Sequence, residues 1–354
     1  AGWPKLTRPD MQQDWHLGVD RWAAALHGRG WTMQSEIVAL SYEEAAALAR
    51  CHENSEDEEV PGDSAIVGNL MGRVHAAMTH VGGSAFVKLS TRSPKDAIYE
   101  ESCPEVAMNL EMELESKLQQ FFTGPQARQD AANTATIAWF RACAAAFKCT
   151  DAQRAERLLK TSTRVLFDLN AATCAWEDGA CAGSFPLSVI VRAWQLMEPH
   201  QEFRGFVTAG KLCALSQYYH HCFFPETVLQ RECIARDIQS FFAEAEPLLR
   251  DSLEGADSYV VDFLYLDEKE PKGKQSKVQI IELNPLCSTT SGCLFKWDNV
   301  ADTHAMQDTS AFTLRLLEAL PEQASFLQCP VRQTRERLEQ WVSSRLNATL
   351  QACS

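Results

Sequence analysis

The stretch from Tyr259 to Trp297 constrains the fold more than any other, because its pattern predicts two paired strands. Its first arm, YVVDFLYL, is β-branched and aromatic throughout, and its second arm, KVQIIELNP, is largely apolar. The segment between them, DEKEPKGKQSK, is polar and contains Pro271 and Gly273, which predicts a solvated loop. A β-hairpin is therefore expected in this part of the chain.

Three side chains with oxygen donors interrupt these apolar arms. Glu282 and Asn284 are two residues apart in one strand, so they project from the same face, and a paired strand can bring Asp262 opposite them. Two carboxylates and an amide carbonyl suit a magnesium ion that keeps some waters and also contacts phosphate. A single acidic residue in a strand is more often a surface residue, but three such donors on two apolar strands favour a metal site.

Composition limits the class of protein. The 354 residues, of which 45% are hydrophobic, allow two or three domains or subdomains with a substantial core. A net charge of −14 argues against nonspecific binding to nucleic acid or to an anionic membrane. No apolar run reaches the roughly 18 residues that a membrane span requires.

The first residues and the cysteines bear on the cellular compartment. The N-terminal sequence AGWPKLTRPD has neither an initiator methionine nor the apolar core of a signal peptide, so we expect a trimmed chain that is not secreted. The 13 cysteines are odd in number and form no CxxC pair, which favours reduced thiols over disulfides or a zinc site. A cytoplasmic location is expected.

Several further segments are predicted to be helical. Apolar residues at helical spacing predict helices within residues 11–50, 66–80, 103–157 and 299–350. Within the third of these, we expect Trp139, Phe140 and Phe147 to belong to the core rather than to stack on a cofactor. The segment DAQRAERLLKTSTRVLFDL is expected to pass from a helix into a strand that contains Lys160.

A second informative stretch, SAFVKLSTRSPKDAIY, places Lys88 inside a short apolar strand that opens into a polar turn. A cation in a strand beside hydroxyls and further cations is the composition of a phosphate-binding loop. The alternative is an edge-strand lysine followed by a basic turn. The loop is not of the Walker type, because GxxxxGK[ST] does not occur in the chain.

Arg204 is the third candidate. The pattern FRGFV–TAGK–LCALS predicts a hairpin that turns at Ala209 and Gly210, with Arg204 in its first arm between Phe203 and Phe206. A buried arginine requires an anionic partner, which is either a carboxylate or a ligand phosphate.

Six of these motifs occur in the order found in the cell division cycle protein 123 family, which belongs to the ATP-grasp superfamily. They are SAFVKLSTRSPKDA, RLLKTS, VIVRAWQ, EFRGFV with ALSQ, FFPE, and VVDFLYLD with IIELNP and LFKW. The match covers most of residues 75–300, so the chain resembles this family. The resemblance implies an α+β, ATP-grasp fold in which two α/β subdomains with mainly antiparallel sheets clasp a nucleotide cleft.

The resemblance also implies how the chain is divided. A helical, partner-facing segment would span residues 1–75 and contain an acidic loop at 53–63. A small ATP-grasp subdomain with a helical insertion would span 76–190, and a large subdomain with the metal site would span 191–300. C-terminal helices would occupy 301–354.

ATP and Mg²⁺ are the cofactors that the resemblance implies. The side chains over the phosphates would be Lys88, Ser90, Ser93 and Lys95. The hinge whose backbone meets adenine would be Arg192, Ala193 and Trp194. The ligands of one or two magnesium ions would be Asp262, Glu282 and Asn284. Arg204 would face the terminal phosphates and is the candidate catalytic residue.

Three departures from the family pattern lie near the expected position of a γ-phosphate or second substrate. Arg92 stands in the phosphate loop, Tyr218 and Tyr219 stand where the family carries Arg-Asp, and Leu286–Thr289 stands where Gly-Glu follows Asn-Pro. These positions bear on what happens after nucleotide binding rather than on binding itself.

Two functions are compatible with the resemblance. In the first, the protein is a monomeric assembly factor, or chaperone, that binds ATP and engages the γ subunit of translation initiation factor 2. In the second, it is an ATP-grasp ligase that forms an acyl phosphate, which an amine, a thiol or a hydroxyl then captures. Such chemistry needs alignment and charge neutralisation rather than a protein nucleophile, and Arg92 and Arg204 would suit a carboxylate substrate.

Overall fold

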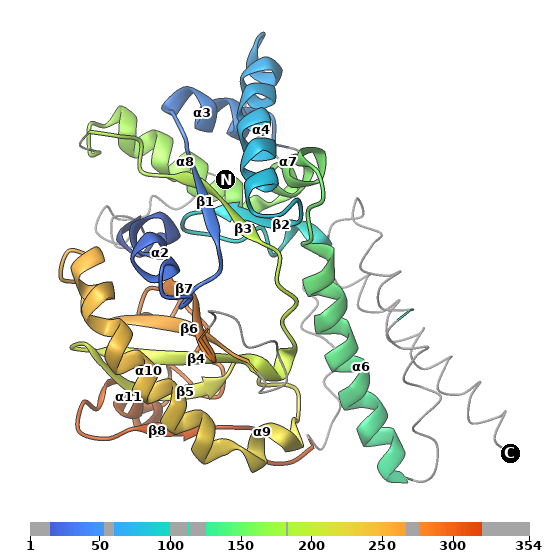
Figure 1. The fold of residues 1–354 in the computed structure, drawn as a ribbon, viewed down its shortest axis with the longest axis vertical. Helices are drawn as coiled ribbons and strands as arrows, with labels where there is room; N and C mark the ends of the chain where they lie inside the picture. Colours follow the sequence, from blue (N-terminus) through green and yellow to red (C-terminus); the bar gives the residue numbers. More distant parts are fainter. Residues whose placement is uncertain are drawn as a thin grey trace, which may run out of the picture.

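The computed structural model is an α+β molecule in which two β-sheets lie one above the other (Figure 1). The structure describes residues 15–52, 60–99, 112, 125–181, 183–266 and 276–320. The expected fold class, α+β with mostly antiparallel sheets, is confirmed. Most of the expected acidic loop, the tip of the expected hairpin at 267–275, and all residues after 320 lie outside the described part.

The strands are β1 (Ser35–Ala39), β2 (Ala85–Leu89), β3 (Ser188–Ala193), β4 (Glu202–Thr208), β5 (Lys211–Gln217), β6 (Tyr259–Tyr265), β7 (Val278–Asn284) and β8 (Thr313–Arg315). The helices are α2 (Val19–His27), α3 (Tyr42–Arg50), α4 (Asp63–His80), α6 (Pro125–Ala146), α7 (Ala152–Thr161), α8 (Thr163–Glu177), α9 (Pro225–Leu229), α10 (Arg231–Ser252) and α11 (Val300–Gln307). Two short 3₁₀ turns, η1 (Ala97–Tyr99) and η2 (Pro199–Gln201), complete the set.

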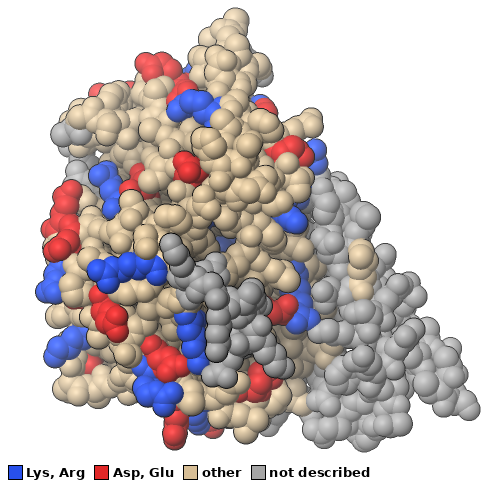
Figure 2. Space-filling view, viewed as in Figure 1, with Lys and Arg blue, Asp and Glu red and all other residues tan. Residues whose placement is uncertain are grey.

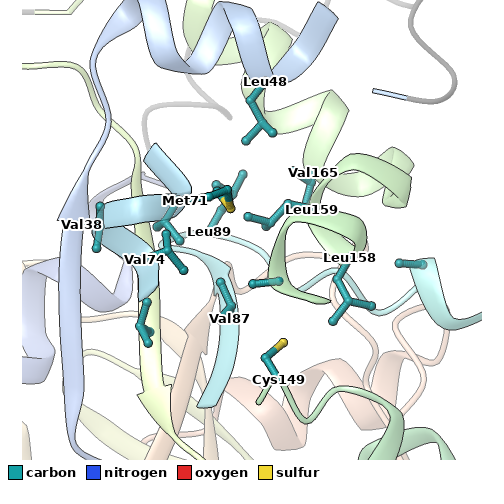
Figure 3. Packing of buried hydrophobic residues seen from close by; sticks show 14 of the residues in the cluster. Val38, Leu48, Met71, Val74, Val87, Leu89, Cys149, Leu158, Leu159 and Val165 are labelled. Atoms are coloured by element: carbon teal, nitrogen blue, oxygen red, sulfur yellow. The ribbon is translucent and has the colours of Figure 1, made fainter. Parts of the chain in front are cut away.

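The three-stranded sheet has the order β1-β3-β2, with both pairs antiparallel. Alternate residues of β2 and β3, such as Val87, Leu89 and Val191, pack into a core with residues of α3, α4, α7 and α8. Figure 3 shows Val87 and Leu89 in this core. The opposite face of this sheet carries Lys88, so the sheet separates a dry core from the space between the sheets. Because β1 pairs with β3, the segment before residue 75 contributes directly to this sheet.

The five-stranded sheet has the order β7-β6-β4-β5-β8. The expected hairpin turns at Ala209 and Gly210 between β4 and β5, and β6 pairs with β7 as the second expected hairpin. One face buries alternating residues such as Phe203, Val261 and Phe263 against α10. The residues between them in sequence, including Arg204 and Asp262, therefore project from the other face.

Arg192 and the segment before β1 join the two sheets at the edge of β7. The buried guanidinium of Arg192, in β3, donates to Ser35 Oγ (3.2 Å), to Thr32 Oγ1 (2.7 Å) and to the carbonyl of Ile281 in β7. Thr32 in turn donates to the carbonyl of Ile280 (2.8 Å), whose N–H donates to the carbonyl of Trp31 (2.8 Å). These bonds satisfy backbone N–H and C=O groups at the edge of β7 and hold the two sheets together on this side.

Helix α6 runs along a second side of both sheets (Figure 1). In its first half, Asn133 makes two hydrogen bonds to the backbone of Phe223, at 2.9 and 2.8 Å. Just beyond its end, the ring of Phe147 packs edge-on against Phe86 in β2, with centroids 5.8 Å apart. The helix therefore contacts the five-stranded sheet's loops at one end and the three-stranded sheet at the other.

The expected strand around Lys160 is wrong. Residues 152–161 form α7 and residues 163–177 form α8, with Ser162 ending one helix and capping the next through a bond from the Val165 N–H. Lys160 pairs with Glu156 one turn earlier (2.7 Å). The apolar run RVLFDL buries Val165, Leu166 and Leu169, which is a helical spacing rather than a strand alternation.

Acidic and basic side chains are interspersed on the face of the molecule in Figure 2, where the described residues form no broad basic surface. No described helix is long and apolar enough to cross a membrane.

Candidate functional site

Strand register aligns three charged residues across the five-stranded sheet. Arg204 in β4 lies opposite Asp262 in β6, and Asp262 lies opposite Glu282 in β7. Residues directly opposite in antiparallel strands share a face, so all three side chains point toward the three-stranded sheet. Arg204 and Asp262 form a buried bidentate ion pair, with N–O distances of 2.8 and 2.7 Å.

Two lysines reach this row from the three-stranded sheet. Lys88 projects from β2 and its Nζ donates to Glu282 Oε2 at 3.0 Å. Lys95, in the loop after β2, places its Nζ 3.8 Å from Glu282 Oε1 and donates to the hydroxyl of Tyr218 at 2.9 Å. Groups that are 194 residues apart in the chain thus meet between the two sheets.

A cavity of about 540 Å³ lies at this meeting point and is here named the cleft. Its polar wall includes Lys88, Lys95, Glu202, Asp262 and Glu282. Its apolar wall comes from both sheets, from α6 and from the residues after β3, and comprises Met33, Phe86, Ile98, Phe140, Phe147, Trp194, Met197 and Ile281 among others. A cavity of this size, with an apolar wall and convergent charges, is typical of a small-molecule site.

Burial and pairing set the charges in the cleft. Burial alone would raise the pKa of Glu282, but Lys88 and Lys95 outweigh this effect and hold that pKa well below its usual value. Burial lowers the pKa of the Lys88 ammonium, and Glu282 opposes the shift. Glu282 is therefore an anion held by two cations.

The donor set fits a magnesium ion that shares its coordination with water and phosphate. Asn284 Nδ2 lies 3.4 Å from Asp262 Oδ2 and 3.5 Å from Glu282 Oε1, so the three expected ligands are adjacent. Among the described residues, no group of three His, Cys, Asp or Glu side chains could hold a metal on its own. Two carboxylates and one amide suit Mg²⁺ better than Zn²⁺, because Mg²⁺ prefers oxygen ligands and retains waters.

The structure brings most of the sequence-predicted residues to the cleft, and those that line it are Lys88, Ser93, Lys95, Arg192, Ala193, Trp194, Asp262 and Glu282. Ser90 does not line it; its hydroxyl accepts a hydrogen bond from the N–H of Ser188, the first residue of β3 (3.3 Å). The side chain of Arg192 is committed to joining the sheets. Arg204 is not among the lining residues, and its guanidinium is paired with Asp262.

Several residues that line the cleft escaped the sequence analysis. Phe140 and Phe147 were expected in the core, but both line the cleft, while Trp139 is buried. Glu202 also lines it and accepts a hydrogen bond of 3.3 Å from Tyr219, one of the two tyrosines already expected near a γ-phosphate. Glu202 carries a signal that could have been used, since it lies two residues before Arg204 and so shares its face of the strand.

Arg92, which the ligase hypothesis would use, is not among the residues that line the cleft. Its Nε lies 2.9 Å from Asp168 Oδ1, on α8, and Thr91 donates to the other oxygen of the same carboxylate at 2.6 Å. Arg92 therefore attaches the loop to α8 at a point away from the cleft.

Comparisons with known proteins agree with this architecture. The chain is 25% identical to the translation initiation factor eIF2 assembly protein of Xenopus laevis over 228 residues, which are 64% of this chain and 52% of that protein. It is 29% identical to cell division cycle protein 123 of Candida glabrata over 177 residues, which are 48% of this chain and 45% of that protein. The chain thus spans about half the length of the curated relatives it matches.

The fold is shared with a solved structure. The structure of Cdc123 from Schizosaccharomyces pombe superposes with a TM-score of 0.55 at 18% identity, covering 86% of this chain and 97% of that chain. The model of the D123 family matches residues 133–336, which is more than half of the chain and includes the second half of α6, the five-stranded sheet and the row of Arg204, Asp262 and Glu282. The chain belongs to the D123 family, and cell division cycle protein 123 of Candida glabrata is among the proteins it resembles.

Proposed function

We propose that this protein binds ATP together with Mg²⁺ in the cleft, in the manner of ATP-grasp proteins, and acts as an assembly factor for translation initiation factor 2. The observation that carries the nucleotide part is the convergence of Lys88 and Lys95 from one sheet with Asp262 and Glu282 from the other. Cations and a divalent metal neutralise a triphosphate, and the apolar wall offers a planar base a dry surface.

The ion pairs explain why metal and nucleotide would bind together. Asp262 is paired with Arg204, and Glu282 is paired with Lys88, so each potential metal ligand already holds a cation. If a nucleotide bound alone, its phosphates would pair with the cations and leave the carboxylates unpaired. If Mg²⁺ bound alone, it would pair with the carboxylates and leave the cations unpaired. When both enter, the cations have phosphate partners and the carboxylates have a metal. ATP is therefore expected to bind at least tenfold more tightly with Mg²⁺ than without it.

Calorimetric titration of ATP, with and without Mg²⁺, tests the site. Lys95→Met is the informative variant, because this lysine is 41% exposed and its replacement leaves the core intact. Loss of a charge-assisted contact to phosphate is expected to weaken binding by about tenfold or more. Lys160→Met is the matched control, since Lys160 lies on α7 and pairs with Glu156. If the Lys95 variant binds as tightly as the parent protein, or if Mg²⁺ has no effect, the nucleotide site is wrong.

The assembly role rests on family membership and on the names of the relatives, which describe eIF2 assembly proteins. Capture of the purified γ subunit of that factor, with and without Mg²⁺–ATP, tests it directly. Binding that increases with Mg²⁺–ATP supports an assembly factor in which the nucleotide orders the binding surface. ADP release that depends on an added carboxylic acid, without capture of the subunit, would instead indicate a ligase.

A further inference from the structure

Tyr218 lies between two cations, Lys95 and Arg204. It directly follows β5, and its side chain lines the cleft. Its hydroxyl accepts a hydrogen bond from Lys95 Nζ at 2.9 Å, and the Arg204 guanidinium lies over its ring, 4.8 Å from the centroid. A single phenol thus contacts one cation from each sheet.

The hydroxyl of Tyr218 has a hydrogen left to donate. Burial raises the pKa of Tyr218 above its ordinary value of 10.0, against the opposing effect of Lys95 and Arg204, so the phenol is protonated at neutral pH. A lysine ammonium can only donate, so the Tyr218 oxygen is the acceptor in that bond. Among the residues that the structure describes, Lys95 is the only hydrogen-bond partner of this hydroxyl. Its own hydrogen is therefore available to an acceptor that enters the cleft.

The cleft has a direction that indicates which acceptor this is. Phe86 and Lys88 are two residues apart on the same face of β2, about 7 Å along the strand. Phe86 lies with Phe147 and Trp194 in the apolar part, near the end of β3, whereas Lys88 begins the charged part. A nucleotide with its base against the apolar wall would direct its phosphates toward Lys88, Lys95 and Tyr218.

We infer that the Tyr218 hydroxyl donates a hydrogen bond to the terminal phosphate of a nucleoside triphosphate and so distinguishes triphosphates from diphosphates. The inference rests on the proposed function, because it assigns a specificity role within the same cleft. Triphosphates and diphosphates are distinguished because Lys95 and Tyr218, which are hydrogen-bonded to each other, both donate to the same terminal phosphate. A diphosphate ends before it reaches them and leaves the phenol without an acceptor.

The test compares the affinities of Tyr218→Phe for ATP and ADP, each with Mg²⁺, by calorimetry. The variant keeps the ring beneath Arg204 and removes only the hydroxyl. It is expected to weaken ATP binding by about tenfold or more, because a hydrogen bond to a charged group is lost, and to change ADP binding less than threefold. Tyr42→Phe is the matched control, since that hydroxyl donates to Glu177 and neither residue lines the cleft. The control should leave the ratio of ATP to ADP affinity at the parental value.

A second comparison separates direct contact from support of Lys95. In a Lys95→Met background, Tyr218→Phe should still lower the ratio of ATP to ADP affinity. If the ratio is unchanged there, or if Tyr218→Phe weakens both nucleotides equally in the parent background, the phenol does not contact the third phosphate and the inference is overturned. If the parent protein binds ATP but Tyr218→Phe keeps the parental ratio of ATP to ADP affinity, only this inference is overturned. A parent protein that binds neither nucleotide removes the proposed function as well. Unfolding temperatures without ligand verify that each variant is folded.

Discussion

Glu202 shows how strongly the cleft alters the chemistry of a single residue. It begins β4, lines the cleft and accepts a hydrogen bond from the Tyr219 hydroxyl. Burial raises the pKa of its carboxyl from 4.5 to about 7, an effect that Lys95 opposes and Asp262 reinforces. Glu202 therefore takes up a proton on folding at mildly acidic pH, unlike Glu282, whose pKa Lys88 and Lys95 lower.

This difference predicts a pH dependence of stability. Because the pKa of Glu202 is higher in the folded protein, the folded state binds more protons than the unfolded state between pH 4.5 and about 7. The free energy of unfolding should fall across this range as pH rises, by at most about 3.4 kcal/mol at 1.36 kcal/mol per pKa unit. Glu202→Gln keeps an acceptor for Tyr219 but cannot ionise, so it should lose this slope and exceed the parent in stability above pH 7.

Urea unfolding at pH 5 to 8 measures the effect. Glu254→Gln is the control, because that carboxylate is 73% exposed, and it should keep the parental slope. If Glu202→Gln follows the parental curve at every pH, the raised pKa of Glu202 is wrong.

At the scale of elements, the turn between β4 and β5 carries a residue that fits its conformation poorly. Ala209 has φ of 50° and Gly210 has φ of 71°, so both central residues are left-handed, as in a type I′ hairpin turn. Asparagine and glycine adopt this conformation at lower cost than alanine, whose left-handed form costs about 1 kcal/mol. The hairpin forms despite Ala209 because Val207 and Leu215 are buried on the face that packs against α10.

Ala209→Asn is therefore expected to stabilise the protein by about 0.5–1 kcal/mol, because it relieves backbone strain without removing the N–H bond to Ser258 Oγ. Gly210→Ala is the matched opposite change. Its new Cβ would lie 2.8 Å from Glu246 Oε1, and its φ is left-handed, so it should destabilise the protein. Thermal unfolding of both variants measures the pair, and a stabilising Gly210→Ala or a destabilising Ala209→Asn would contradict this account of the turn.

At the scale of the whole molecule, two sets of contacts on different sides of the cleft hold the two sheets at their spacing. Arg192 and Thr32 join β3 to the edge of β7. Helix α6 spans the other side, from the Asn133 contact with Phe223 to the packing of Phe147 on Phe86. The cleft is therefore bounded by segments that are distant in sequence from the charged residues it contains.

Asn133→Ala should separate the start of α6 from the turn after β5. It removes two hydrogen bonds and leaves the N–H and C=O of Phe223 without partners, which predicts a loss of about 2 kcal/mol. Amide hydrogen exchange should become faster in residues 218–224, and nucleotide affinity should fall because Tyr218 and Tyr219 lie in that turn. Asn170→Ala, at an exposed position on α8, should change neither quantity. Unchanged exchange in the turn after Asn133→Ala would exclude this role for α6.

Local pattern was sufficient for much of the molecule. The β-branched and apolar arms of β6 and β7 were enough to predict their pairing, and the shared face of Glu282 and Asn284 was enough to expect Asp262 near both, because these are short-range properties of strands. The register that places Asp262 directly opposite Glu282 came from the structure. The same local pattern failed at Lys160, since an apolar run such as RVLFDL fits a buried strand or a helix, and packing against α3 decided for the helix.

The tertiary structure alone decided which charges meet. The sequence by itself determined that Lys88, Arg204, Asp262 and Glu282 lie in apolar strands, and therefore that each needs a partner when buried. It could not determine that Lys88 pairs with Glu282, that Arg192 joins the sheets, or that Phe140 of α6 and Phe147 just after it line the cleft. These contacts link residues from different sheets and helices, and they form only when the sheets stack, so no local pattern encodes them.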